Sequence, residues 1–197
     1  MKLKNQLSFL SIFLFLIYQM VIAAPLINEE QYVALNKPIL GIPQVVEFFS
    51  FLCPHCYQLE SIFHHKKISS HMKMVKYHVA FTENELFLTQ AWSVAIALGI
   101  ENSVILPIFQ TIINNNFSYN DILEIFVNLG ISKKDYNYLW NSYTIRLLSL
   151  KQEQLAQRIG LQTIPTIVIN GKYLLKNDVI RGFYDYKTII TYLYNLH

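Results

Sequence analysis

The sequence contains little charge and no region dominated by charge of one sign. Asp, Glu, Lys and Arg make up 15% of its 197 residues, and the formal net charge is +3. Because it has neither a long run of Lys or Arg nor a nucleic-acid-binding motif, we expect no nucleic acid partner. Hydrophobic residues reach 53%, which excludes a disordered chain and is enough for a substantial core.

A long hydrophobic run occurs only at the N-terminus. Lys2 and Lys4 precede a mostly apolar stretch over residues 7–17, and short side chains follow at residues 21–23. This order is typical of a secretory signal peptide, which we predict over residues 1–23. The alternative is an uncleaved membrane anchor. With either one, the rest of the chain is exported, and we expect a periplasmic protein.

Cysteine is nearly absent: the chain has two, Cys53 and Cys56, three positions apart. A disulfide between them would close a very short loop and remove little entropy from the unfolded chain. The pair is therefore a poor structural crosslink and indicates redox chemistry instead.

Two other interpretations of these cysteines stay open. One is a purely structural disulfide. The other is a zinc site that adds histidines to the pair, although no second Cys pair or spaced His pair completes a tetrahedral set. The histidines concerned are His55, His64, His65 and His71. We expect no metal, and we expect His78, which lies in a strand pattern, to be structural.

Hydrophobic patterning predicts a strand–helix–strand unit around the cysteines. Residues 44–51 form a nearly continuous apolar run, typical of a strand buried on both faces. A helix is predicted over residues 57–67 and a second strand over residues 72–80. Such a unit is expected to be right-handed, with parallel strands.

The remainder of the chain predicts a helical block, a hairpin and a last helix. Helices are expected over residues 88–98, 103–114, 119–129 and 133–149, then strands over 165–169 and 172–175 and a helix over 184–196. Gly99 and Gly130 are expected to end helices, and Ser132 with Asp135 resembles a capping box. Asn170-Gly171 is a strong hairpin signal. We predict an α/β fold with a helical insertion.

The position of Cys53, after a buried strand and at the start of a helix, favours its thiolate. Helix N-termini expose N–H groups and carry partial positive charge, and Pro54 suits the first helical position. The pKa of Cys53 should therefore lie below the ~8.5 of a free thiol, and His55 can add a hydrogen bond or positive charge. Because a stable thiolate favours the reduced protein, the disulfide form becomes oxidising. We expect Cys56 to be the buried resolving thiol.

Several motifs resemble the DsbA family of periplasmic disulfide-forming oxidoreductases. They are VEFFSFLCPHCY (residues 46–57), KYHV (76–79), LTQAW (88–92), WNS (140–142) and NGKY (170–173). An acidic cysteine and an oxidising disulfide are established properties of this family, so the expectation for Cys53 agrees with a known case.

The resemblance implies a thioredoxin fold with an inserted helical domain. We assign residues 24–83 to the first part of the thioredoxin domain, 84–150 to the helical domain and 151–197 to the second part. In this fold an X–Pro bond is cis beside the redox pair, which implies Ile164–Pro165. Ile164 backbone groups would then pair with the client chain.

The resemblance also implies a buried charged pair, Glu47 and Lys76. In the family these residues lie beneath the redox site and relay protons to the buried cysteine. An equally open interpretation is a structural ion pair, because an unpaired charge inside an apolar strand is costly.

We therefore predict an enzyme, a protein disulfide oxidoreductase without a cofactor other than the Cys53–Cys56 disulfide. Its expected partners are reduced exported proteins and a DsbB-like quinone-linked membrane protein that reoxidises it, and we expect a monomer. A reductase or isomerase, or a peptide-binding chaperone with an incidental cysteine pair, are the alternatives. The segment 82–87 is shorter than in the family, and the sequence after Leu175 matches poorly, which leaves the client range and the docking to the reoxidase open.

Overall fold

The computed structural model describes residues 27, 29–64, 66, 68–69, 71–114 and 117–196. The predicted signal peptide, residues 1–23, lies outside them, as does His65. Within the described residues, none of the helices has the length and apolar character needed to span a membrane.

The core of the fold is a five-stranded mixed sheet with strand order β1-β5-β4-β2-β3. The strands are β1 (Tyr32–Ala34), β2 (Val45–Phe49), β3 (Val75–His78), β4 (Thr166–Ile169) and β5 (Tyr173–Leu175). The predicted parallel pair is confirmed, because β2 and β3 run parallel while the other pairs are antiparallel. The edge strand β1 was not predicted, since three residues carry too little alternation to be recognised.

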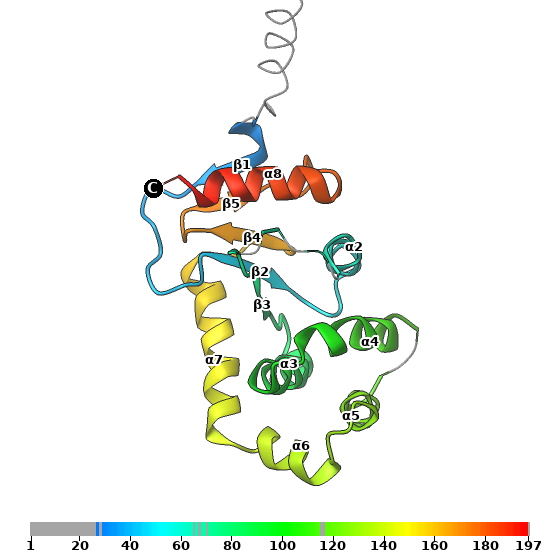
Figure 1. Ribbon diagram of the computed structural model, residues 1–197. Coiled ribbons are helices and arrows are strands. Elements are labelled where there is room, and N and C mark those ends of the chain that lie inside the picture. Colours follow the sequence, from blue (N-terminus) through cyan, green and yellow to red (C-terminus); the bar gives the residue numbers. More distant parts are fainter. Residues whose placement is uncertain are drawn as a thin grey trace, which may run out of the picture.

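Seven α-helices lie in the described part of the chain. They are α2 (Pro54–Phe63), α3 (Leu86–Leu98), α4 (Glu101–Asn114), α5 (Tyr119–Asn128), α6 (Lys133–Trp140), α7 (Tyr143–Arg158) and α8 (Gly182–Tyr194), with 3-10 turns at Glu29–Gln31 and Glu83–Glu85. The expected α/β class is confirmed. Figure 1 shows α3, α4, α5 and α6 gathered beyond one side of the sheet, with α7 joining this block to it.

Helices cover both faces of the sheet, which explains why every residue of β2 is buried. Val45 packs with residues of α2 and α8, whereas Val46 and Phe48 pack with residues of α7. This alternation follows from the two-residue period of a strand. Glu47, two residues after Val45, consequently belongs to the α2 face.

The single helix predicted over residues 133–149 is wrong. Helix α6 ends at Trp140, and a separate helix, α7, begins at Tyr143 and continues to Arg158. Ser142 caps the new helix, because its side chain accepts a hydrogen bond from the Ile145 amide at 3.3 Å. Similarly, α2 ends at Phe63 rather than at residue 67.

Helix α7 contacts both α3 and β3, so it packs against the helical block and the sheet. The domain boundary predicted between residues 150 and 151 falls inside it. The division into domains stays a prediction.

Candidate active site

Cys53 is the N-cap of α2 and follows strand β2, an inner strand of the sheet. Its backbone is extended, and Pro54 follows in the first turn. The Cys53 Sγ accepts a hydrogen bond from the Cys56 amide at 3.2 Å, which satisfies one of the free N–H groups of the helix end. Cys53 is partly exposed, whereas Cys56 is fully buried in the aromatic core formed with the helical block.

The two thiols differ in acidity. The pKa of Cys53 is lowered to about 6, mainly by a hydrogen bond from the Cys56 thiol and further by the amides of Cys56 and His55, against the effect of burial. The pKa of Cys56 is raised, first by burial and then by its hydrogen bond to Cys53. At neutral pH this arrangement provides one thiolate near solvent and one buried thiol.

His55 contributes less directly than the sequence suggested. Its Nδ1 lies 3.4 Å from Gln58 Oε1, and within the described residues no hydrogen bond joins the imidazole to Cys53. Its backbone amide and its charge both lower the pKa of Cys53, and the charge is the smallest of the named causes.

The loop before β4 faces Cys53 from across the site. The Ile164–Pro165 peptide bond is cis. The Ile164 carbonyl oxygen lies 3.8 Å from Cys53 Sγ, within reach of the weak donor of a thiol. A strand of another chain that reached Cys53 would therefore run past the Ile164 backbone.

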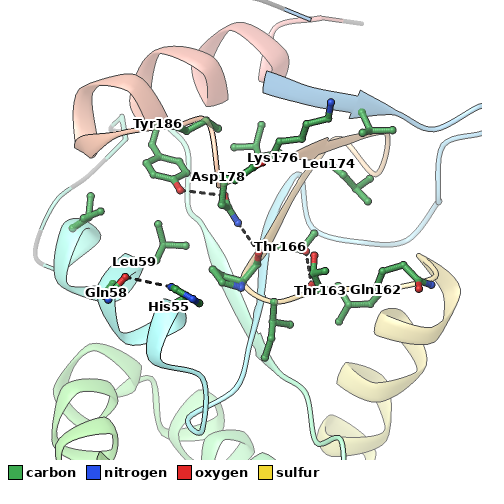
Figure 2. A pocket seen from close by; sticks show the side chains of 18 of the residues that line it. His55, Gln58, Leu59, Gln162, Thr163, Thr166, Leu174, Lys176, Asp178 and Tyr186 are labelled. Atoms are coloured by element: carbon green, nitrogen blue, oxygen red, sulfur yellow. Dashed lines mark hydrogen bonds between the residues drawn. The ribbon is translucent and has the colours of Figure 1, made fainter. Parts of the chain in front are cut away.

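A groove of about 710 Å³ extends from this loop along α2. Figure 2 shows His55, Gln58 and Leu59 on the α2 side, Thr163 and Thr166 at the loop, and Tyr186 above Leu59 in this view. Residues at the end of β5 complete the wall. The groove is open and partly apolar, as a site for an extended peptide requires.

A buried charged cluster lies beneath the redox pair. Register places Glu47 of β2 opposite Lys76 of β3. Lys76 Nζ lies 3.5 Å from Glu47 Oε2, which is within the range of an ion pair. Glu47 Oε2 has no hydrogen-bond partner among the described residues. The pKa of Glu47 is raised because burial outweighs the attraction of Lys76.

Sequence analysis missed a third member of this cluster, Glu60 of α2. Its side chain is 3% exposed and forms an ion pair with Lys76, and His64 Nδ1 lies 3.3 Å from its Oε1. Burial lowers the pKa of Lys76, but the two carboxylates raise it overall. Glu60 lies one helical turn after Cys56 on the same face of α2, but this spacing alone does not distinguish a buried Glu from a solvated one.

The other histidines form no metal site that the structure describes. No group of three or more His, Cys, Asp or Glu side chains within the described residues is arranged to hold an ion. His78 is buried, its Nδ1 lies 2.8 Å from Thr89 Oγ1, and its ring stacks on Phe51. Burial lowers the pKa of His78 to about 3, so its ring is neutral.

Comparison with known proteins gives consistent matches. The family model described as DSBA-like thioredoxin domain matches residues 44–187. The thiol:disulfide interchange protein DsbA of Escherichia coli K12 is 43% identical, over 78% of this chain and 78% of its own. DsbA of Salmonella typhimurium LT2 is likewise 43% identical, over 77% of each chain.

Solved structures agree with these matches. A cysteine-to-serine variant of Proteus mirabilis DsbA, solved with the non-covalently bound peptide PWATCDS, has a TM-score of 0.76 and 35% identity. The match covers 87% of this chain and 99% of that one. Another structure of Proteus mirabilis DsbA has a TM-score of 0.71 and 38% identity, over 85% and 93% of the two chains.

Proposed function

Because the chain belongs to the family of DsbA-like thioredoxin domains and is a thiol:disulfide oxidoreductase, we propose that it donates its Cys53–Cys56 disulfide to reduced exported proteins. The supporting observation is the contrast between the two sulfurs: Cys53 is accessible at the N-terminus of α2, and Cys56 is buried behind it. Only Cys53 can meet a client sulfur.

The exchange proceeds in two displacements. A client thiolate attacks Cys53 Sγ, a client–Cys53 disulfide forms, the Cys53–Cys56 bond breaks, and Cys56 leaves with the electron pair and takes up a proton. A second client thiolate then attacks the client sulfur of this mixed disulfide and releases Cys53 as a thiolate. The client has lost two electrons and two thiol protons, and the protein is the reduced dithiol.

The low pKa of Cys53 supports the oxidising direction. The hydrogen bonds to Cys53 stabilise its thiolate, a form that only the reduced protein has, so they favour acceptance of electrons. If the client does not supply the second thiolate, Cys56 attacks Cys53 and the client leaves unchanged. The redox pair is the only cofactor required.

Further roles follow from the position of each residue. Ile164 backbone groups pair with the client beside Cys53, Pro165 fixes this loop, and Pro54 and His55 favour the Cys53 thiolate. Glu47 and Lys76 supply and remove the proton of Cys56. We place the protein in the periplasm as a monomer, exported by residues 1–23 and reoxidised by a DsbB-like membrane quinone reductase.

The test is equilibration of the protein with glutathione buffers of graded ratio. We expect a reduction potential well above the roughly −270 mV of thioredoxin. A value near that of thioredoxin would overturn the donor function in favour of a reductase. Clients that are still served by a Cys53→Ser variant would indicate a chaperone instead.

A further inference from the structure

The loop that faces Cys53 has three consecutive carbonyl groups, each held by a side chain. Thr166 Oγ1 donates to Thr163 O at 2.7 Å. The Cys53 thiol approaches Ile164 O at 3.8 Å, and Asn177 Nδ2 donates to Pro165 O at 2.5 Å. Each of these carbonyl oxygens therefore has a side-chain contact, in the part of the loop that a client chain would pass.

These three contacts differ in strength and origin. The Thr166 hydrogen bond joins two residues of the loop itself, so it stabilises the conformation of the loop without attaching the loop to the rest of the protein. A thiol is a weak donor, and the Cys53 thiolate donates nothing. The Asn177 amide therefore provides a strong attachment from outside the loop, and it persists when Cys53 is ionised.

Asn177 is itself oriented by a second residue. Its Oδ1 accepts a hydrogen bond from the hydroxyl of Tyr186 at 3.2 Å. Tyr186 lies on α8 and is 3% exposed, and burial raises the pKa of its phenol, so the hydroxyl keeps its proton. The two bonds, which Figure 2 draws as dashed lines between Tyr186 and the loop near Thr166, join end to end through the amide. Both ends of the amide are occupied, which leaves it one orientation.

We propose that Asn177, oriented by Tyr186, is a positioning residue for client recognition. It holds the Pro165 carbonyl, and with it the adjoining Ile164 backbone, at the height of Cys53 Sγ. This inference rests on the proposed function, since it concerns how a polypeptide client is presented to the disulfide. A small thiol needs no backbone pairing and is indifferent to the loop.

The experiment compares two reductants of the oxidised protein. One is the peptide PWATCDS, which carries a single cysteine, and the other is 2-mercaptoethanol. The second-order rate constant of each is measured for the wild type, Asn177→Leu and Tyr186→Phe. Asn141→Leu serves as a matched control, because Asn141 Nδ2 also donates to a backbone carbonyl, Asn137 O at 2.7 Å, between α6 and α7.

We expect Asn177→Leu to lower the rate constant for the peptide about tenfold, the range of one lost hydrogen bond. Tyr186→Phe should lower it several-fold, because the amide stays but loses its orientation. The rate constant for 2-mercaptoethanol should stay within about twofold of the wild type in both variants, and Asn141→Leu should change neither.

An equal loss with both reductants, or no loss with the peptide in either variant, would overturn the positioning role. Tyr186→Phe decides the matter on its own if Asn177→Leu fails to fold. A wild-type disulfide that oxidises neither reductant would contradict the proposed function instead, so the two failures are distinguishable.

Discussion

Cys53 and Cys56 share one turn of α2, yet a nucleophile can reach only the first. Attack at Cys53 expels Cys56, whose thiol has a raised pKa and is therefore a poor leaving group until it receives a proton. We propose that Glu47 assists this step, because burial raises its pKa and its carboxyl also acts on the pKa of Cys56. A buried carboxyl with a raised pKa can serve as a general acid.

Replacing Glu47 by Gln should therefore slow thiol exchange by roughly tenfold or more while the fold is retained. The fold survives because Lys76 keeps its ion pair with Glu60. Stopped-flow measurement of the reaction with a dithiol peptide checks this, with thermal unfolding as the test of folding.

Glu60→Gln is the matched control for Glu47→Gln. It removes the other buried carboxylate from Lys76, and with it one of the charges that raise the pKa of Glu47, but Glu60 is not among the groups that shift the pKa of Cys56. We expect exchange in this variant to slow much less than in Glu47→Gln. Unchanged kinetics in Glu47→Gln would show that the pair is only structural.

At His55, substitution by Leu should raise the pKa of Cys53 and make the protein less oxidising. The rise should be partial, because the Cys56 thiol and two backbone amides still stabilise the thiolate. We expect a pKa between about 6 and the ordinary 9.0, measured by the ultraviolet absorbance of the thiolate. An identical Cys53 pKa in the wild type and the variant would show that the His55 side chain has no part in stabilising the thiolate.

At the scale of the elements, the turn of the β4–β5 hairpin depends on Gly171 for its conformation. Asn170 and Gly171 both have positive φ, 52° and 63°, as a tight type I′ turn requires. The Gly171 carbonyl also accepts the Ile39 amide at 2.9 Å, and an added Cβ would lie 2.3 Å from Ile39 O. The segment before β2 is therefore packed directly on the turn.

Gly171→Ala should lower the free energy of unfolding by about 2 kcal/mol or more, since strain at positive φ and a backbone clash add together. Gly99→Ala is the control, with a φ of 68° and open space at the Cβ position. It should cost only about 1 kcal/mol. Urea unfolding of both variants tests the difference. Equal decreases in the free energy of unfolding would show that the backbone at Ile39 moves away from the added Cβ without destabilising the protein.

Elements set by local chemistry were predictable from the sequence. The buried β2 run, the Asn170-Gly171 turn and the end of α3 at Gly99 each follow from neighbouring residues. The break before α7 was missed because Ser142 is compatible with a helix interior until its side chain caps a new one.

Features that depend on distant contacts were not predictable. Glu60 looks like a solvated helix residue until β3 brings Lys76 beside it. Asn177 reaches Pro165 only when β5 pairs with β4, and Tyr186 reaches Asn177 only when α8 packs on the sheet. The identities of Cys53, Cys56 and Pro165 were visible in the sequence, whereas the contacts that support them were not.

For the whole molecule, the acidity of Cys53 makes stability depend on redox state and pH. In the reduced protein the folded pKa is about 6, below the ordinary 9.0. Between these values the unfolded chain binds more protons than the folded one, so the stability of the reduced form rises with pH. This contribution is complete above about 9 and is lost as pH falls through about 6.

The oxidised protein has no titrating thiol, so it lacks this dependence. The difference in unfolding free energy between reduced and oxidised protein should shift in favour of the reduced form as pH rises across that window. Urea unfolding of both forms at three pH values measures it. A difference independent of pH would mean that the Cys53 pKa is not lowered in the folded state.

The contact between Cys53 and Ile164 joins residues 111 positions apart, and this separation has a consequence for biosynthesis. With the export and donor function proposed above, both thiols would leave the export machinery well before the loop that faces them. A chain in transit would then hold two reduced cysteines and no recognition site, like the reduced clients proposed for a finished copy. On this proposal each new copy begins as a recipient of disulfides and becomes a donor once β4 has paired with β2.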